Sequence, residues 1–123
     1  MSEKHTQDLI RLKLGSNPHV LVVRRNVGTF YTRDGRPQRI GSPGEADLQG
    51  IIDGQHCPNC SCPIHPAPFA IEVKSERGKL RKDQVNWRDN VWTRRNGIYV
   101  LARDADEAIK DLNDSLPSPV LST

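Results

Sequence analysis

Residues 69–74 are the segment that most restricts how this chain can fold. The run Phe69-Ala70-Ile71-Glu72-Val73-Lys74 is apolar or β-branched except at Glu72 and Lys74, which predicts a buried strand. Side chains alternate along a strand, so Glu72 and Lys74 project from one face while Ile71 and Val73 project from the other. Burying a carboxylate and an ammonium costs desolvation free energy that folding does not require. The pair is therefore a candidate for chemistry, with a surface ion pair on an edge strand as the alternative.

A third charged residue, Asp47, lies upstream and can complete a hydrolytic site with this pair. Oxygen ligands from Asp47 and Glu72 suit a hard divalent cation. Lys74 can orient a water molecule and neutralise charge on a phosphate. These three residue types in this order are what a metal-dependent nuclease requires.

The segments around this trio make the pattern more specific. Asp47 ends the run Gly41-Ser42-Pro43-Gly44-Glu45-Ala46-Asp47, and Arg24-Arg25-Asn26-Val27-Gly28 precedes it. Downstream of Lys74 come Gly78-Lys79-Leu80, Gln84, Trp87, Gly97 and Tyr99. In this order the chain, from about Glu3 to Ala108, resembles the virus-type replication-repair nuclease (VRR-NUC) family of the PD-(D/E)xK superfamily. Ala46 departs from the family pattern, which has Pro before the metal-binding Asp.

The resemblance implies a restriction-endonuclease-like core and a Mg²⁺- or Mn²⁺-dependent DNA endonuclease. The metal ligands would be Asp47, Glu72 and the backbone carbonyl of Val73, and Lys74 would position the attacking water. Gln84 would hold Lys74 or that water in place, and Glu3 would act through a metal-bound water. A first-turn acid that complements the helix dipole is the alternative for Glu3, and local helix hydrogen bonding is the alternative for Gln84.

The resemblance also implies a substrate and an assembly. Stand-alone members of the family resemble Holliday-junction resolvases, so the implied substrate is branched DNA cut by a homodimer. A role in DNA repair would follow. The small stand-alone format of the chain suggests a phage or prophage origin. A flap or nicking nuclease with the same metal site is an alternative.

Length and composition fit one domain with an anionic partner. The 123 residues support one modest core, and the net charge of +3 is mildly basic. We expect a single nuclease domain over residues 1–114 and a disordered tail over 115–123. The N-terminus lacks the apolar core of a signal peptide, and no apolar run reaches membrane-spanning length. The expected location is the cytoplasm, or the host cytoplasm for a phage protein.

Periodicity predicts an α/β fold in the order α-β-β-β-α-β-α, with a mixed sheet flanked by helices. Helices are expected at 3–14 and 82–96 and after the Asp104 capping box; strands are expected at 19–25, 46–53, 69–74 and 98–102. Residues 33–39 are expected to be a turn-rich connection around Asp34-Gly35. On the 82–96 helix, α-helical spacing places Gln84, Trp87 and Val91 on the sheet-facing side, with Trp92 off it.

Arginines and one lysine on the expected loops suit contacts with DNA phosphates, because the guanidinium fork binds phosphate bidentately. Ordinary solvated surface is the alternative for each residue taken singly. The candidate DNA contacts are Arg24, Arg25, Asn26, Arg33, Arg36 and Lys79.

All three cysteines fall in one insertion, residues 55–67, which is expected to be a Cys-rich hairpin. Cys57, Cys60, Cys62 and His65 supply four ligands of the kind that bind structural Zn²⁺, and His56 could replace His65. Only Ser61 separates the two ligand pairs, which is shorter than in known structural sites. The alternative is a Pro-rich hairpin with incidental thiols. With zinc bound and the carboxylates structural, the chain would instead be a non-catalytic nucleic-acid-binding module.

Overall fold

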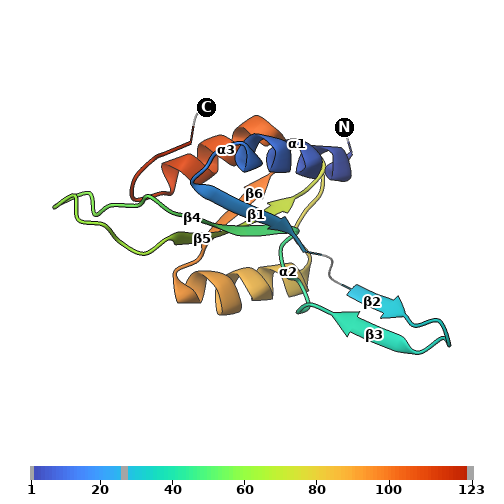
Figure 1. Ribbon diagram of the computed structural model, residues 1–123. Helices are drawn as coiled ribbons and strands as arrows, with labels where there is room; N and C mark the ends of the chain where they lie inside the picture. The colour runs from blue at the N-terminus through green and yellow to red at the C-terminus, as the bar shows by residue number, and fades with distance from the viewer. Residues whose placement is uncertain (1, 26–27, 122–123) are drawn as a thin grey trace.

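The computed structural model describes residues 2–25 and 28–121, with only the backbone described at 28–30, 39 and 40. A four-stranded sheet in the order β1-β4-β5-β6 lies at its centre (Figure 1). The strands are β1 (Val20–Arg24), β4 (Leu48–Ile52), β5 (Ala67–Val73) and β6 (Ile98–Ala102). The first three pair antiparallel and β6 pairs parallel to β5, so the sheet is mixed, as predicted.

Helices cover both faces of this sheet (Figure 1). One face carries α1 (Glu3–Gly15) and α3 (Ala105–Asp114). The other carries a continuous helical segment made of α2 (Lys82–Asn86), the π-helical η1 (Trp87–Trp92) and the 3₁₀-helical η2 (Thr93–Arg95). This segment connects β5 to the parallel β6, as a crossover between parallel strands requires. The chain is therefore a mixed α/β protein with a helix-flanked sheet.

Both outer helices begin where the sequence predicts. Ser2 caps α1, its hydroxyl accepting from the backbone N–H of His5, and Asp104 caps α3 by accepting from the N–H of Glu107. Such caps satisfy backbone donors that have no partner inside the helix. The caps fix the ends of the two helices that close one face of the sheet.

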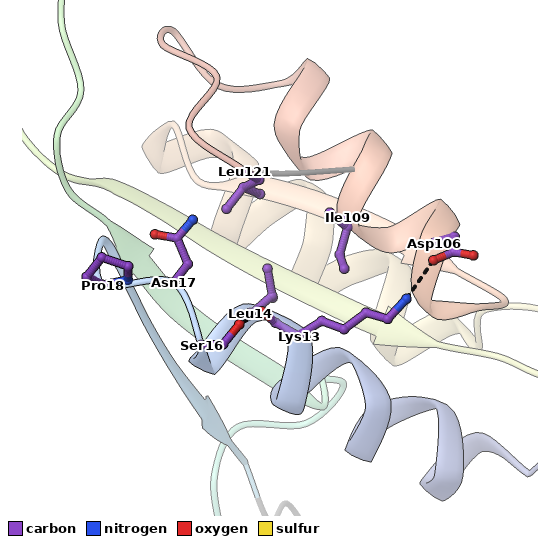
Figure 2. Close-up of a pocket in the computed structure, with 8 residues that line it drawn as sticks. All are labelled: Lys13, Leu14, Ser16, Asn17, Pro18, Asp106, Ile109 and Leu121. Atoms are coloured by element: carbon purple, nitrogen blue, oxygen red, sulfur yellow. Dashed lines mark hydrogen bonds and ion pairs between the residues drawn. The ribbon is translucent and has the colours of Figure 1, made fainter.

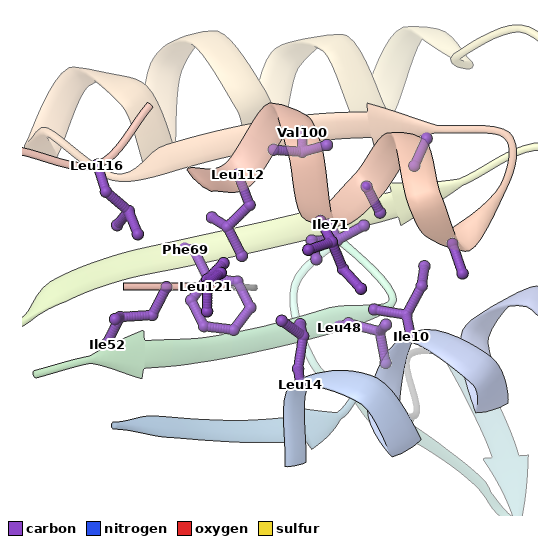
Figure 3. Close-up of a cluster of buried hydrophobic side chains, with 14 of the residues drawn as sticks. Ile10, Leu14, Leu48, Ile52, Phe69, Ile71, Val100, Leu112, Leu116 and Leu121 are labelled. Atoms are coloured by element: carbon purple, nitrogen blue, oxygen red, sulfur yellow. The ribbon is translucent and has the colours of Figure 1, made fainter. Parts of the chain in front are cut away.

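The main core lies between the sheet and the α1–α3 layer (Figure 3). Ile71 and Phe69 of β5 meet Ile10 and Leu14 of α1 and Leu112 of α3 there, all essentially inaccessible to solvent. A second, smaller cluster of Ala46, Ala70 and Trp87 lies on the opposite face. Alternation along β5 thus sends its odd-numbered side chains into the main core and leaves the even-numbered ones for the smaller side.

The turn expected around Asp34-Gly35 is present, but it joins the two strands of a hairpin, so the prediction of a strandless connection is wrong. Strands β2 (Gly28–Tyr31) and β3 (Pro37–Ile40) form a separate two-stranded sheet that projects from the body (Figure 1). The short runs carry several polar residues and lack a strong alternating pattern, so hydrophobic periodicity gives little signal. Arg36 N–H donates to the hydroxyl of Thr32, and Gly35 adopts φ +86° in the turn between the strands.

The expected disordered tail is also incorrect over residues 115–121. Leu116 and Leu121 are buried in the main core, and Asn17 donates to the carbonyl of Val120. Ser118 exchanges hydrogen bonds with buried Gln55, which ties this segment to the base of the β4–β5 loop. The prolines and serines suggested disorder, but the two leucines supply apolar area that binds the segment to the sheet.

A pocket of about 550 Å³ lies between α1, α3 and this C-terminal segment (Figure 2). Leu14, Ile109 and Leu121 supply apolar walls, and Lys13 pairs with Asp106 at 2.7 Å across the opening. This pocket lies on the opposite side of the sheet from Glu72. Among the helices in the described part of the chain, none is long and apolar enough to cross a membrane.

Gly50 tests how closely β1 and β4 pack. A Cβ there would lie 1.9 Å from the carbonyl oxygen of Leu21 and 2.8 Å from the ring of Phe69. We expect Gly50→Ala to lower the free energy of unfolding by about 3 kcal/mol, because backbone and core would both have to shift. Urea unfolding monitored by circular dichroism measures this effect. Gly15→Ala is the control, since its Cβ would meet none of the described atoms within 4 Å, and equal losses in both variants would contradict the prediction.

Candidate active site

The pairing of β4 with β5 brings Asp47 and Glu72 together. Asp47 directly precedes β4, and Leu48 pairs with Ile71, so the two acids are neighbours at one end of the sheet. The backbone N–H of Asp47 donates to Glu72 Oε2 at 3.1 Å, and the N–H of Val73 donates to Asp47 Oδ2 at 3.2 Å. Each carboxylate is thus held by the other strand's backbone, and the Val73 peptide lies beside both.

Glu72 also binds two side chains predicted to act with it. Gln84 Nε2 donates to Glu72 Oε1 at 2.6 Å, and Lys74 Nζ lies 3.7 Å from the same oxygen. All three side chains are at least nine-tenths buried as residues. Gln84 was expected to reach toward Lys74; instead it fixes the carboxylate that Lys74 faces. The Gln84 amide oxygen accepts from the N–H of Arg81, which holds the amide in this orientation.

Burial dominates the electrostatics of Glu72. Burial and then the negative charge of Asp47 raise the pKa of Glu72, while the N–H of Asp47 and the charge of Lys74 lower it, and the net result is a rise from 4.5 to about 8. A divalent cation between the two acids would favour the charged form instead. Two carboxylates are the number that Mg²⁺ commonly takes from a protein, with the rest of its ligands from water and phosphate. The donor set therefore fits a hard cation.

The π-helical turn explains how the helical segment packs over this site. An α-helix would place Val91 beside Trp87, but in the wider π turn residues five apart lie one above the other. Trp92 consequently stacks on Trp87 with ring centroids 5.0 Å apart, and its indole N–H donates to the carbonyl of Ile98. Val91 is exposed, so its expected position against the sheet is wrong. Trp92, expected to lie off that side, packs instead against the cluster of Ala46, Ala70 and Trp87.

Tyr99 is a residue near the acids whose role the sequence did not indicate. Its hydroxyl is buried and has no hydrogen-bond partner among the described residues. Burial and then the charge of Glu72 raise the Tyr99 pKa above its usual value. Tyr99 packs against Trp87 with centroids 6.2 Å apart. Tyr99 pairs with Ala70 across the β5–β6 ladder, and its place in the family pattern was the signal that the sequence offered.

Glu3 reaches the end of β5 from the other side of the sheet. Its Oε2 accepts from the N–H of Ser75 at 3.1 Å, immediately after Lys74. Gln7, one turn further along α1, is buried with an amide oxygen that lacks a partner among the described residues. The structure thus brings Glu3 close to the strand end; its action through a metal-bound water stays a prediction.

Some of the candidate DNA contacts already form ion pairs with acidic side chains, and others are exposed to solvent. Arg25 donates to Glu45, whose side chain is nearly buried, and Arg36 pairs with Asp34 on the surface. Arg24, Arg33 and Lys79 are exposed. Asn26 lies outside the described residues. Arg25 therefore has a structural partner that a DNA contact would have to share.

The cysteine insertion extends the β4–β5 hairpin. His56 and Pro63 form an isolated antiparallel β-bridge. The N–H of Ile64 donates to the carbonyl of Gln55, and the N–H of Cys57 donates to the carbonyl of Cys62. Ser61 adopts φ +60° in the connecting turn. The three free thiols lie close together, whereas His65 lies three residues beyond Cys62, between the Pro63 bridge and the start of β5.

Zinc at this tip stays a prediction. Within the described residues, no three His, Cys, Asp or Glu side chains are grouped so that they could hold a metal ion. The predicted set of Cys57, Cys60, Cys62 and His65 would thus require the loop to rearrange. Asp47 and Glu72 offer two carboxylates, so a cation there would take its other ligands from the Val73 carbonyl, water and phosphate.

Comparison with known proteins adds no relative: no family model, curated protein or solved structure matches the chain.

The pH dependence of stability tests the buried Glu72. Between about pH 4.5 and 8 the unfolded chain has released this proton while the folded protein retains it, so raising the pH favours unfolding. We expect this group to lower stability by up to a few kcal/mol across that window, with no further loss above it. Glu72→Gln should remove the decline, and Glu76→Gln, at an exposed position, should keep it. Urea titrations at several pH values measure the difference, and identical pH profiles for wild type and Glu72→Gln would refute the assignment.

Thiol reactivity tests the hairpin tip. Hydrogen bonds from the thiols of Cys62 and then Cys57 lower the pKa of Cys60, and Cys60 is exposed. In chelator-treated protein we expect Cys60 to react first with a chromogenic disulfide, because the thiolate is the nucleophile. Mass mapping of the labelled peptide identifies the thiol, and Cys60→Ser should remove the fast phase. Adding Zn²⁺ should suppress labelling of all three thiols if the zinc prediction is right.

Proposed function

We propose that this protein is a metal-dependent DNA endonuclease with a restriction-endonuclease-like core that acts in the cytoplasm. The observation that supports it most is the convergence of Asp47, Glu72 and Lys74, which are distant in sequence, around one buried carboxylate group. Folding alone does not require two acids and an amine at one end of a sheet, because their desolvation opposes burial. A hydrolytic site would require this arrangement.

The residues have separate tasks in this proposal. Asp47, Glu72 and the Val73 carbonyl would hold Mg²⁺ or Mn²⁺, which supplies Lewis-acid activation of water and neutralises phosphate charge. Lys74, whose ammonium lies 3.7 Å from Glu72, would orient the attacking water and stabilise charge that develops on the phosphate. Gln84 fixes the Glu72 carboxylate through its 2.6 Å hydrogen bond and so acts as a positioning residue.

Branched DNA is the substrate that we propose, cut by a homodimer. This preference rests on the resemblance to the VRR-NUC family. A panel of four-way, flap and nicked DNA would separate it from a flap or nicking activity.

Cleavage of a labelled four-way junction tests the activity. We expect Mg²⁺-dependent nicking by wild type, reduced about a hundredfold or more in Asp47→Asn because that change removes a charged cation ligand. Asp8→Asn, on exposed α1 surface, is the matched control and should retain activity. Junction binding without added Mg²⁺ and without chelator, measured in parallel, identifies a non-catalytic zinc-stabilised binding module: binding without any Mg²⁺-dependent cleavage in wild type would replace the nuclease proposal.

A further inference from the structure

The basic excess of this protein is concentrated in one segment. Residues 24–39 contain five arginines and one acid, a net charge of +4, whereas the whole chain carries +3 and the remainder therefore −1. No lysine occurs in this segment. Arginine is the cation that binds phosphate bidentately and keeps its charge at any physiological pH.

This segment is the β2–β3 hairpin and its entry, and it projects away from the sheet (Figure 1). Its tip is open to solvent: Arg33 is exposed, and both Tyr31 as a residue and the side chain of Arg36 are more than 70% exposed. Arg36 pairs with Asp34 within the turn, which orders the tip while leaving the guanidinium accessible. A projecting, ordered and cationic hairpin is suited to a polyanion.

The base of the hairpin is attached to the candidate active site. Arg25, just before it, donates its N–H to the carbonyl of Asp47 at 2.7 Å and its guanidinium to Glu45. Glu45 also accepts from Ser42 N–H and from Gln49, so one carboxylate holds both ends of the base. Gly44 packs so closely on the carbonyl of Asp83 in α2 that a Cβ would lie 2.0 Å from it. The hairpin therefore has a fixed point of attachment beside the two acids.

We propose that the β2–β3 hairpin is an arm that binds phosphates of the DNA backbone at a distance from the cleaved bond. This inference rests on the proposed function and specifies how far along the substrate the protein reaches. From Gly28 to the turn at Asp34 the arm extends about 20 Å at the strand rise. Laid along the helix axis, that span covers about six phosphates of one strand, since successive phosphates rise about 3.4 Å along the axis. Arg33 and Arg36 contact phosphates at this distance, and Arg25 holds the base of the arm.

Salt dependence of binding tests the arm. Junctions whose branches have 12 or 4 base pairs are titrated with protein in chelator, and the slope of log Kd against log salt is compared. Arg33→Ala/Arg36→Ala should lower the magnitude of the slope by about 2 on the long branches, because two phosphate contacts are lost. On the short branches the variant and wild type should have the same slope. Arg11→Ala/Lys110→Ala removes the same charge from the α1–α3 layer and should leave both slopes unchanged.

Each outcome decides the assignment. An unchanged slope in the tip variant, or an equal change in the control, overturns it, as does a tip variant that becomes monomeric by sedimentation with unchanged DNA binding. Cleavage at saturating DNA separates this inference from the nuclease proposal: the Arg11→Ala/Lys110→Ala control should retain wild-type turnover, whereas Asp47→Asn loses it. Circular dichroism of both double variants confirms that the fold is intact. If wild type binds with the predicted length dependence but does not cleave, the arm stands and the nuclease proposal fails.

Discussion

The reciprocal attachment of Asp47 and Glu72 is the interaction on which the rest of the candidate site depends. Each carboxylate accepts a hydrogen bond from the backbone beside the other, so strand pairing itself fixes their separation. The backbone donors partly offset the cost of placing two negative charges in a buried site. The free energy of desolvation and charge repulsion that they do not offset raises the pKa of Glu72. A cation would remove that cost, which links the geometry of the sheet to the chemistry that we propose.

The two faces of the sheet have different tasks for the same physical reason. Alternation along β5 puts Phe69, Ile71 and Val73 into the main core, which supplies most of the buried apolar area. The opposite positions, Ala70 and Glu72, face a thinner layer closed by Trp87 and Gln84. Most of the apolar burial that stabilises the fold is therefore on the α1–α3 face of the sheet. The opposite face can accommodate polar groups such as Glu72 and Gln84 that do not stabilise the fold.

Two hairpins extend this core at opposite ends in Figure 1. The β4–β5 extension carries the thiols, and the β2–β3 hairpin carries the arginines. Both are exposed over most of their length, so packing restricts their sequences little and leaves them open to surface interactions. Only the arginine hairpin is attached directly beside the acids, through Arg25 and Glu45, which is why we connect it to the same substrate.

The sequence by itself determined the elements whose periodicity or capping is local: the β5 strand with its alternating faces, β6, and the two capped outer helices. It also singled out Asp47, Glu72, Lys74 and Gln84 through the family resemblance. Tertiary structure alone decided that Gln84 binds Glu72 rather than Lys74, because that depends on how α2 lies over the sheet. It likewise decided the packed tail, whose leucines join a core built from distant segments, and the π turn, in which Trp92 stacks on Trp87. The β2–β3 hairpin is local, but its polar strands alternate too weakly for a pattern to predict it.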